Sequence, residues 1–547
     1  MAIELSNLTF TEQDDIVPSS GVEQIRNTGV ANTLAGNDKI TGSWALDNNF
    51  DVEYGFFNSG IFNTAEGNDI IIGIANVNGI INTGTFNTGE GDDVITGESD
   101  SHAIIISSGS IFDTGDGNDR ISGNSSNLEG RDFINGISND SFNFNTGDGN
   151  DTIEGNAATL YGIFNQGYIN TGNGKDIIIA NIRNYDNGAA LFNGVIMSSS
   201  LATISIIDTG EDDDIITVDG EIVNRGTIDT GNGDDLINAY TSGYPYGSGI
   251  TNMNAIEAGE GNDTIEGNSE EYIGISNIGS INTGNGKDII IGSGSSFGLA
   301  NFSSTIDTGD DDDIIISTAV SFNENIISNS GAIYNDGTIN TGNGQDSIIS
   351  KGNFNNRGVV FLGEGNDSIT ASIIAEVGLP NRALENFNAI ETGNGDDIIT
   401  STGVIYNEGV INTGSGNDYI EGVDIAGTGY GIYNNGGAIN MGNGNDSIIA
   451  NEGFESAPNS SGAWFLGDGE DYIKGFGSGD FYGGSGNDTL ELTPGTYTVG
   501  IWGEGGESPI FTKGNQLMIT SEFEKLKAGS TIYDFTSLTA GQIIIVA

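Results

Sequence analysis

The chain has 547 residues, of which 88 are glycine, only 6 are proline and none is cysteine. Its 77 acidic and 15 basic residues give a formal net charge of −62, which makes nucleic acid and anionic membranes poor partners. The absence of cysteine excludes disulfides and thiolate metal sites, while 36% hydrophobic residues supply enough apolar material for a packed core.

Residues 1–33 are expected to form an N-terminal cap segment. The stretch "MAIELSNLTFTEQ" alternates apolar and polar residues in the manner of a strand. It has no basic region followed by an apolar stretch, and no apolar run in the chain approaches the roughly 18 residues of a membrane span. We therefore expect no membrane span, and the start of the chain fits either a cytoplasmic protein or export without a cleaved signal peptide.

Residues 34–492 carry a repeat built around one aspartate. Each copy reads, with variations, Thr-Gly-x-Gly-(Asn/Asp)-Asp followed by x-Ile, as in "IDTGNGDDLI" (228–237). Successive aspartates are 17 to 38 residues apart, with clusters at 21, 25 and 28, which is the period range of a solenoid. The eighteen aspartates are Asp38, Asp69, Asp93, Asp119, Asp151, Asp176, Asp214, Asp235, Asp263, Asp288, Asp313, Asp346, Asp367, Asp397, Asp418, Asp446, Asp471 and Asp488.

The residues around each aspartate predict a strand, a tight loop and another strand. The two glycines suit a backbone with positive φ or a close approach, and the flanking isoleucines are β-branched strand formers. An Asn-x-Gly corner precedes many loops, as in "YNDGTINTG" (334–342), and an insertion such as 184–200 lengthens one corner. Repetition of this unit predicts an all-β fold, a parallel β-helix or β-roll solenoid of about eighteen coils with terminal caps.

A ladder of polar side chains is expected at one corner of this solenoid. The residue before Thr-Gly is usually Asn or Asp, so stacking would bring these side chains together. The ladder is expected to comprise Asn82, Asp113, Asn170, Asp208, Asn282, Asp307, Asn340, Asn412 and Asn440.

The repeat resembles the nonapeptide Gly-Gly-x-Gly-x-Asp-x-(large apolar)-x of the repeats-in-toxin (RTX) calcium-binding family. The likeness covers residues 34–492 and is greatest at 467–492, where Asp480 lies midway between Asp471 and Asp488. It implies that loop carbonyls and the aspartate carboxylate bind several calcium ions, with all eighteen aspartates as metal ligands. Such ions would also relieve the repulsion between carboxylates stacked about 4.8 Å apart.

Three departures from the family pattern affect the expected sites. The first glycine of the motif is usually Thr, and most coils carry one nonapeptide rather than two, so a single row of ions is expected. In "TGEDDD" (209–214) and "TGDDDD" (308–313) the second glycine is an aspartate, which either impairs the sites or adds carboxylates to them. Lys175 and Lys287 stand beside the ligand aspartate and are expected to reduce the local charge.

Two other interpretations of the loops remain. They could be plain β-turns that form solenoid corners without metal, or part of a β-helix polysaccharide lyase or epimerase. His102, expected in an exposed loop, is the one histidine, so the two-histidine zinc motif and any second Ser-His-Asp arrangement are absent. We therefore expect no enzyme.

Residues 493–547 have a different composition and no glycine-rich Asp loop. They are expected to cap the apolar bore with short strands. The end of this segment, "GQIIIVA", resembles the apolar tail of RTX proteins exported by type I secretion.

The sequence predicts a secreted, extracellular calcium-binding structural protein of the bacterial cell surface, such as a surface layer, sheath or fibre. It resembles RTX-type surface proteins of bacteria, including cyanobacteria. Self-association into a filament or lattice is expected, with cell-surface polysaccharide as another partner and no nucleic acid. The alternative is an adhesin that binds a glycan or another cell; an exposed aromatic stripe would favour it.

Overall fold

The computed structural model describes residues 2–19, 23–44, 54–126, 134–183, 188–195, 204–319, 331–373, 381–427, 429–457, 462–502 and 508–547. The expected insertion at 184–200 lies mostly outside these ranges. The chain divides into two compact units, Met1–Asn285 and Gly286–Ala547. Strands dominate both, and the only helices among the described residues are two short 3-10 turns, η1 (Leu5–Asn7) and η2 (Phe535–Ser537).

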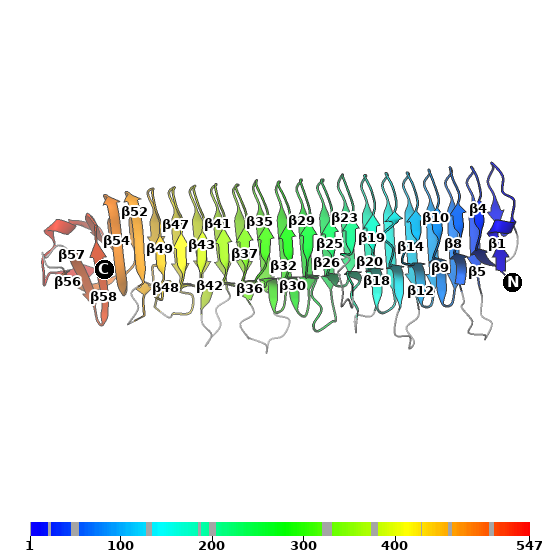
Figure 1. The fold of residues 1–547 in the computed structure, drawn as a ribbon. Coiled ribbons are helices and arrows are strands. Elements are labelled where there is room, and N and C mark those ends of the chain that lie inside the picture. The colour runs from blue at the N-terminus through cyan, green and yellow to red at the C-terminus, as the bar shows by residue number, and fades with distance from the viewer. Residues whose placement is uncertain are drawn as a thin grey trace. The chain divides into compact units, whose positions relative to one another are not determined.

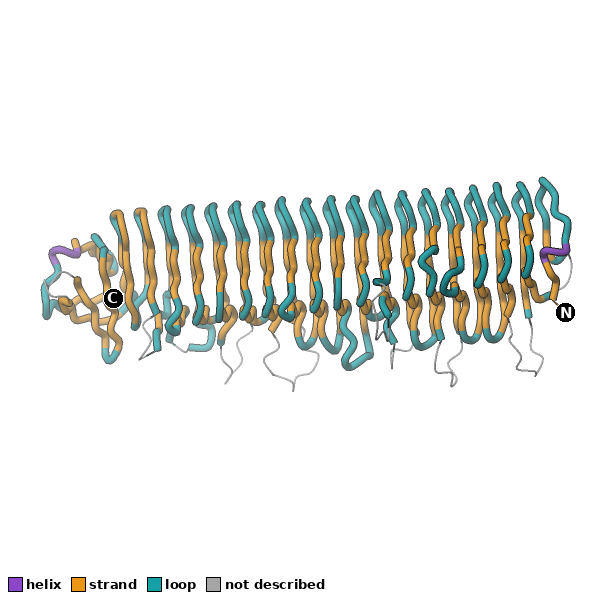
Figure 2. Tube along the Cα trace, in the orientation of Figure 1, coloured by secondary structure: helices purple, strands orange, loops and turns teal. Residues whose placement is uncertain are grey.

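Each unit is a parallel β-solenoid, which confirms the predicted fold class (Figure 1). A coil contributes one strand to each of three sheets, which we name A, B and C. In one coil, for example, β8 lies in sheet B, β9 in sheet A and β10 in sheet C, and a glycine-rich loop then leads to β11 in sheet B. Figure 2 shows these loops, in teal, between the strands of sheets C and B.

The strands of the first unit pair in parallel with their equivalents in neighbouring coils. Sheet A consists of β1 (Ala2–Glu4), β3 (Gln24–Asn27), β6 (Tyr54–Asn58), β9 (Asn78–Asn82), β12 (His102–Ile106), β15 (Asn135–Asn139), β18 (Tyr161–Asn165), β21 (Leu191–Asn193), β24 (Ile222–Asn224), β27 (Ile250–Asn252) and β30 (Ile273–Asn277). Sheet B consists of β2 (Ile16–Val17), β5 (Lys39–Ser43), β8 (Ile70–Ala75), β11 (Val94–Ser99), β14 (Arg120–Ser125), β17 (Thr152–Ala157), β20 (Ile177–Ile182), β23 (Ile215–Asp219), β26 (Leu236–Thr241) and β29 (Thr264–Ser269). Sheet C consists of β4 (Val30–Asn32), β7 (Ile61–Asn63), β10 (Thr85–Asn87), β13 (Ile111–Asp113), β16 (Phe144–Asn145), β19 (Tyr168–Asn170), β22 (Ile206–Asp208), β25 (Thr227–Asp229), β28 (Ala255–Glu257) and β31 (Ser280–Asn282).

The coils of the second unit repeat this arrangement. Sheet A consists of β33 (Phe297–Asn301), β36 (Gly331–Asn335), β39 (Asn353–Asn356), β42 (Arg382–Asn386), β45 (Val404–Asn407), β48 (Ile432–Asn434) and β51 (Phe454–Glu455). Sheet B contains β32 (Ile289–Gly294), β35 (Ile314–Ala319), β38 (Ser347–Lys351), β41 (Ser368–Ser372), β44 (Ile398–Thr402), β47 (Tyr419–Val423), β50 (Ser447–Ile449), β53 (Tyr472–Lys474) and β55 (Thr489–Leu492). Sheet C contains β34 (Thr305–Asp307), β37 (Thr338–Asn340), β40 (Val359–Phe361), β43 (Ala389–Glu391), β46 (Val410–Asn412), β49 (Ala438–Asn440), β52 (Ala463–Gly469) and β54 (Gly479–Gly486).

The two ends of the repeat differ from one another. At the start, β1 pairs in parallel with β3, so residues 2–19 already follow the path of a coil. In residues 493–547, antiparallel pairing begins: β56 (Gly495–Trp502) pairs with both β57 (Ser508–Lys513) and β61 (Ile543–Val546), and β57 pairs with β58 (Gln516–Ser521). A second antiparallel pair joins β59 (Lys525–Ala528) to β60 (Thr531–Asp534). In the part of the chain that is described, no helix has the length and apolar character needed to cross a membrane.

The core consists of like residues stacked on like, because neighbouring coils pair in register. Ile71 of β8 pairs with Ile95 of β11, and both are buried. In sheet C the rings of Phe62, Phe86 and Phe112 form a column with centroids 5.1 and 4.7 Å apart. The alternation of buried and half-buried residues along these strands is the period-2 pattern of a sheet with one face inward.

An asparagine ladder lines the corner between sheets A and C in each unit. Twelve of its Nδ2 atoms donate to the Oδ1 of the equivalent residue in the next coil at 2.8–3.0 Å, those of Asn82 and Asn434 donate to the carbonyls of Ile111 and Ala463, and every member is fully buried. Ile106 interrupts it in the first unit. The members are Asn27, Asn58, Asn82, Asn139, Asn165, Asn193, Asn224, Asn252, Asn277, Asn301, Asn335, Asn356, Asn386, Asn407 and Asn434.

The expected members other than Asn82 form a second, partial ladder at the ends of the sheet C strands, where they are half-buried. There Asn170 donates to Asn145 at 2.8 Å, Asn145 to Asp113 at 3.1 Å, and Asn340 to Asp307 at 2.8 Å, which confirms the predicted ladder in part. In the second unit Phe361 and Glu391 interrupt this column. Both positions carry Asn-Thr-Gly: residues 82–84 form the corner between sheets A and C, whereas 87–89 begin the glycine-rich loop. His102 also differs from expectation, because it is half-buried in β12 and pairs with Asn78.

The ladder should contribute measurably to stability. Asn224→Ala removes the Nδ2 that donates to Asn252 and the Oδ1 that accepts from Asn193, and it leaves their buried partners unsatisfied. We expect the free energy of unfolding to fall by about 1–3 kcal/mol. Denaturant melts should show no comparable loss for Asn238→Ala, on the outer face of β26. Equal stability of the two variants would contradict a stabilising ladder.

Candidate metal centre

The glycine-rich loops of neighbouring coils lie in direct contact. The amide of Gly67 donates to the carbonyl of Glu90, and that of Gly91 to the carbonyl of Asp116, both at 2.8 Å. Gly91 has φ of 144°, and a Cβ on it would lie 2.0 Å from the carbonyl oxygen of Gly67. Glycine is required here because any side chain would collide with the preceding loop.

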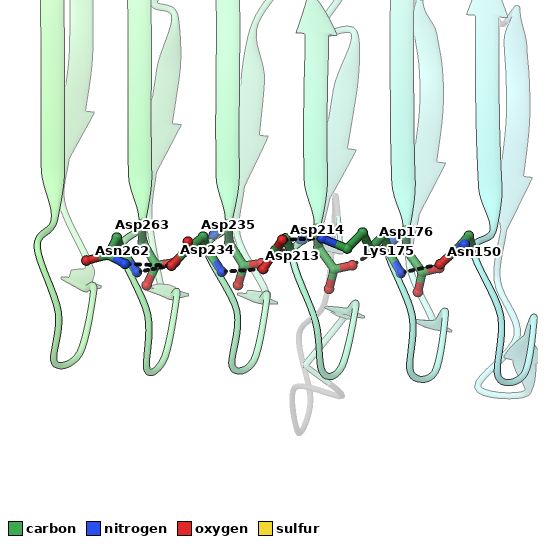
Figure 3. A network of polar contacts seen from close by, with 9 residues as sticks. All are labelled: Asn150, Lys175, Asp176, Asp213, Asp214, Asp234, Asp235, Asn262 and Asp263. Atoms are coloured by element: carbon green, nitrogen blue, oxygen red, sulfur yellow. Dashed lines mark hydrogen bonds and ion pairs between the residues drawn. The ribbon is translucent and has the colours of Figure 1, made fainter.

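The predicted site aspartates form a row along each unit, which we call the inner row. The backbone amide of each aspartate donates to the Oδ1 atom of the aspartate in the following coil at 2.7–2.9 Å, from Asp38 to Asp263 in the first unit and from Asp288 to Asp488 in the second. Figure 3 shows Asp176, Asp214, Asp235 and Asp263 on successive coils. None of the inner-row side chains is more than 3% exposed. The structure thus brings together residues that the sequence spaces 17 to 38 apart.

Only one oxygen of each carboxyl is used in this way. In sixteen inner-row residues the second oxygen, Oδ2, is buried and has no hydrogen-bond partner within the described protein. They are Asp38, Asp69, Asp93, Asp119, Asp151, Asp176, Asp214, Asp235, Asp313, Asp346, Asp367, Asp397, Asp418, Asp446, Asp471 and Asp488. Leaving a buried carboxylate oxygen without a partner is costly, so each of these atoms requires a proton or a cation.

The loop threonines do not supply that partner. Thr64 lies close enough to Asp69 to favour its charged form, yet its hydroxyl donates to the carbonyl of Thr88 at 2.8 Å. Thr88 in turn donates to the carbonyl of Thr114 at 3.1 Å. The threonines therefore form a third row of bonds between coils and leave Oδ2 unmatched.

Burial makes the charged form of the inner row unfavourable. It raises the pKa of Asp93 to about 8 and that of Asp119 to about 6, and the charge of Asp69 adds to the rise at Asp93. In the second unit, burial raises the pKa of Asp313 to about 8 and that of Asp367 to about 7. A row with these pKa values holds protons near neutrality or exchanges them for a bound cation.

The residues that directly precede the inner-row aspartates form an exposed outer row with bonds in the opposite direction. Here a side chain accepts from the amide of the following coil: Asp92 from Asn118 at 2.9 Å, and Asn118 from Asn150 at 3.0 Å. Lys175 interrupts this pattern and instead forms an ion pair with Asp213 of the next coil (Figure 3). Lys287 does the same with Asp312 at 2.5 Å. Both lysines thus offset one outer-row charge.

The two loops with an aspartate in place of the second glycine keep the inner row intact. Asp212 has φ of 82° and Asp311 has φ of 90°, both positive but smaller than the 125° to 157° that glycine adopts at this position in most other loops. Asp214 and Asp313 still accept from Asp176 and Asp288. By contrast, Asp480 is not in the row, because it lies in β54 and pairs with Ala463.

Calcium fits the donor chemistry of the inner row. The available atoms are carboxylate and carbonyl oxygens, which are the ligands that calcium prefers. Among the described residues no group of three or more His, Cys, Asp or Glu side chains is placed to hold a metal. A cation between two coils would therefore depend on loop carbonyls in addition to the unpartnered Oδ2 atoms.

Comparisons with known proteins identify no family. No family model matches the chain, and no curated protein matches it. A solved structure, described as a hyperactive, Ca2+-dependent, β-helical antifreeze protein from an Antarctic bacterium, shares 15% identity over 73% of this chain and 78% of its own, with a TM-score of 0.23. At that TM-score the likeness carries no argument about this chain.

Without metal, the inner row should make stability depend on pH. Its carboxyls have raised pKa values in the folded chain, so the folded chain holds protons that the unfolded chain releases. Stability should be highest near pH 4, close to the ordinary pKa of 3.8, and should fall as pH rises through about 6 to 8. Thermal melts of metal-free protein monitored by circular dichroism test this. A melting temperature that rises with pH over this range would contradict it.

Proposed function

We propose that the chain is a calcium-binding β-solenoid with a structural role outside a bacterial cell. The observation that carries this proposal is the inner row, in which buried carboxylates repeat from coil to coil and sixteen of them leave one oxygen without a hydrogen-bond partner among the described residues. A metal-free row of this kind is a liability at neutral pH, because like charges repel and burial opposes their ionisation. A row of cations turns the same groups into a source of stability.

Calcium outside the cell explains why a protein would keep such a row. Extracellular calcium sites have dissociation constants of about 0.1 to 1 mM, so they stay empty at cytosolic calcium levels and fill outside. Binding to the folded chain alone stabilises it, and each further site adds to the effect. The resemblance of the repeat to the RTX nonapeptide supports the same assignment, with all eighteen inner-row aspartates as ligands. Export of the chain before it folds follows from this scheme.

Asp119→Asn tests the role of the carboxylates directly. Asparagine keeps the Oδ1 that accepts from the amide of Asp93 at 2.8 Å, but it removes the charge. At about pH 8 without calcium, we expect the variant to melt at a higher temperature than the natural chain, since burial raises the pKa of Asp119. With calcium bound, we expect Asp119→Asn to melt at a lower temperature than the natural chain, because the variant lacks one charged ligand. Melts by circular dichroism in chelator and in millimolar calcium measure both effects.

Asp116→Asn is the matched control, because Asp116 is exposed at the tip of the same loop and its Oδ1 accepts from Asp148 at 3.3 Å. We expect it to melt like the natural chain in both conditions. The proposal fails if the natural chain shows the same melting temperature with and without calcium.

A structural role includes self-association, and strand β61 offers a surface for it. Among the described strands it pairs only with β56, and its residues Ile543 and Ile545 are 63% and 72% exposed. It has no charge or proline to prevent further pairing. Residues 493–547 carry five acidic and three basic residues, a net charge of −2, so charge repulsion between copies is weak here.

Charge on β61 should prevent this association. We expect the calcium-loaded natural chain to self-associate with rising concentration and Ile543→Lys/Ile545→Lys to remain monomeric in analytical ultracentrifugation. Ile532→Lys, at a residue 65% exposed on β60, is the control and should associate normally. A natural chain that stays monomeric would argue against the fibre, sheath or lattice.

An aromatic cluster on and beside sheet A bears on the alternative function, the adhesin. Tyr406 and Tyr433 have ring centroids 5.2 Å apart, and Phe387 lies 5.9 Å from Tyr406. The guanidinium of Arg382 stacks 3.5 Å from the Tyr406 centroid and pairs with Glu385, which neutralises it. Tyr406 is only 6% exposed and Phe387 and Tyr433 are half-buried, so this cluster is not the exposed aromatic stripe that would favour an adhesin. Polysaccharide binding by a monomeric chain would favour this function, and we propose a catalytic role for neither surface.

A further inference from the structure

Two loop pairs in the molecule combine the same unusual residues. The loop that ends in Lys175-Asp176 is followed in the next coil by Asp212, Asp213 and Asp214. The loop that ends in Lys287-Asp288 is followed by Asp311, Asp312 and Asp313. One pair lies in each unit.

The extra aspartate lies near the loop of the preceding coil. The negative charge of Asp212 acts on both Lys175 and Asp176 of that loop. Burial raises the pKa of Asp176 to about 6, and the negative charge of Asp212 contributes to that rise, as expected for two close carboxylates.

The gap between these two loops holds an unmatched buried oxygen. The carboxyl of Asp214 reaches toward the preceding coil, where its Oδ1 accepts from the amide of Asp176 at 2.7 Å. Its Oδ2 has no partner within the described protein, and the side chain is fully buried. Asp313 repeats this arrangement two residues from Asp311, since its Oδ1 accepts from the amide of Asp288 at 2.9 Å and its Oδ2 has no partner within the described protein. Each gap thus combines a buried Oδ2 with a second carboxylate at its exposed rim.

The neighbouring lysine does not cancel this extra charge. Lys175 is paired with Asp213, and Lys287 with Asp312, so each ion pair is neutral by itself. Asp212 and Asp311 remain as additional negative charges beyond what the other coils carry at this position, where glycine stands in the remaining sixteen loops. The same combination, a lysine before one inner-row aspartate and at least three consecutive aspartates in the next loop, occurs twice in the chain, which makes a chance substitution a poor explanation.

We infer that these two gaps are calcium sites of higher affinity than the other coil interfaces, with Asp212 and Asp311 as their additional ligands. The inference rests on the proposed function. Calcium affinity rises with the number of charged ligands, so one more carboxylate should lower the dissociation constant by about tenfold. Each unit then has one site that fills first and from which binding extends to neighbouring coils.

Equilibrium dialysis of the full chain with radioactive calcium tests this inference. We expect two ions to bind at about tenfold lower calcium than the rest. Asp212→Gly should remove one tight ion and Asp212→Gly/Asp311→Gly should remove both, leaving the weaker class in place. Glycine adopts a φ of 82° without strain, so these variants should fold. Without calcium they should melt at a higher temperature than the natural chain, because strain and one negative charge per loop are removed.

Glu211→Gln is the matched control. Glu211 precedes Asp212 at the tip of the same loop, and its carboxylate accepts from Asn232 at 3.0 Å. The substitution removes one negative charge from that loop and should leave both tight ions in place. The inference is overturned if Asp212→Gly leaves the tight class unchanged, or if Glu211→Gln removes it equally. Absence of calcium binding by the natural chain would instead overturn the proposed function, and this inference with it.

Discussion

The need to neutralise a buried carboxylate at every coil governs the rest of this structure. Parallel stacking places equivalent atoms about 4.8 Å apart, so any ionisable residue in the repeat becomes a row of like charges. In sixteen inner-row aspartates one oxygen accepts from a backbone amide, as that of Asp69 accepts from Asp38, and the other has no partner among the described residues. Protons or cations must complete these groups. The stability of the fold therefore depends on the proton and cation concentrations of the solution, and the Oδ2 atoms are where that dependence arises.

Close contact between loops explains why the repeat has so little freedom in sequence. Where the carbonyl of Gly67 approaches Gly91, no Cβ fits, and the same holds along both units. The two exceptions are Asp212 and Asp311, which adopt positive φ and stand in the only two loops with a carboxylate at this position.

Much of this arrangement followed from the sequence, and the errors have identifiable causes. The period of the aspartates predicted the solenoid, and the isoleucine-rich strands predicted its core, because a repeated pattern can only stack on itself. The sequence predicts the polar column at the end of sheet C, which forms in part, but not the fully buried asparagine ladder, since Asn82-Thr83-Gly84 and Asn87-Thr88-Gly89 look alike while only Asn82 is fully buried. Side-chain orientation decides which carboxyl oxygen accepts the amide bond and which stays without a partner. It also decides that the hydrogen bonds of the inner and outer rows run in opposite directions. No spacing in the sequence encodes that orientation.

The bonds between coils do not depend on how long a coil is. Asp471 and Asp488 are 17 residues apart and Asp176 and Asp214 are 38 apart, yet their amide-to-carboxylate bonds are 2.9 and 2.7 Å. Every coil presents the same donors to one neighbour and the same acceptors to the other, whatever is inserted between its strands. A whole coil could be duplicated or lost by recombination and the flanking coils would still rejoin. The number of coils and the content of their loops can thus evolve independently, so the surface can vary while the pairing between coils is preserved.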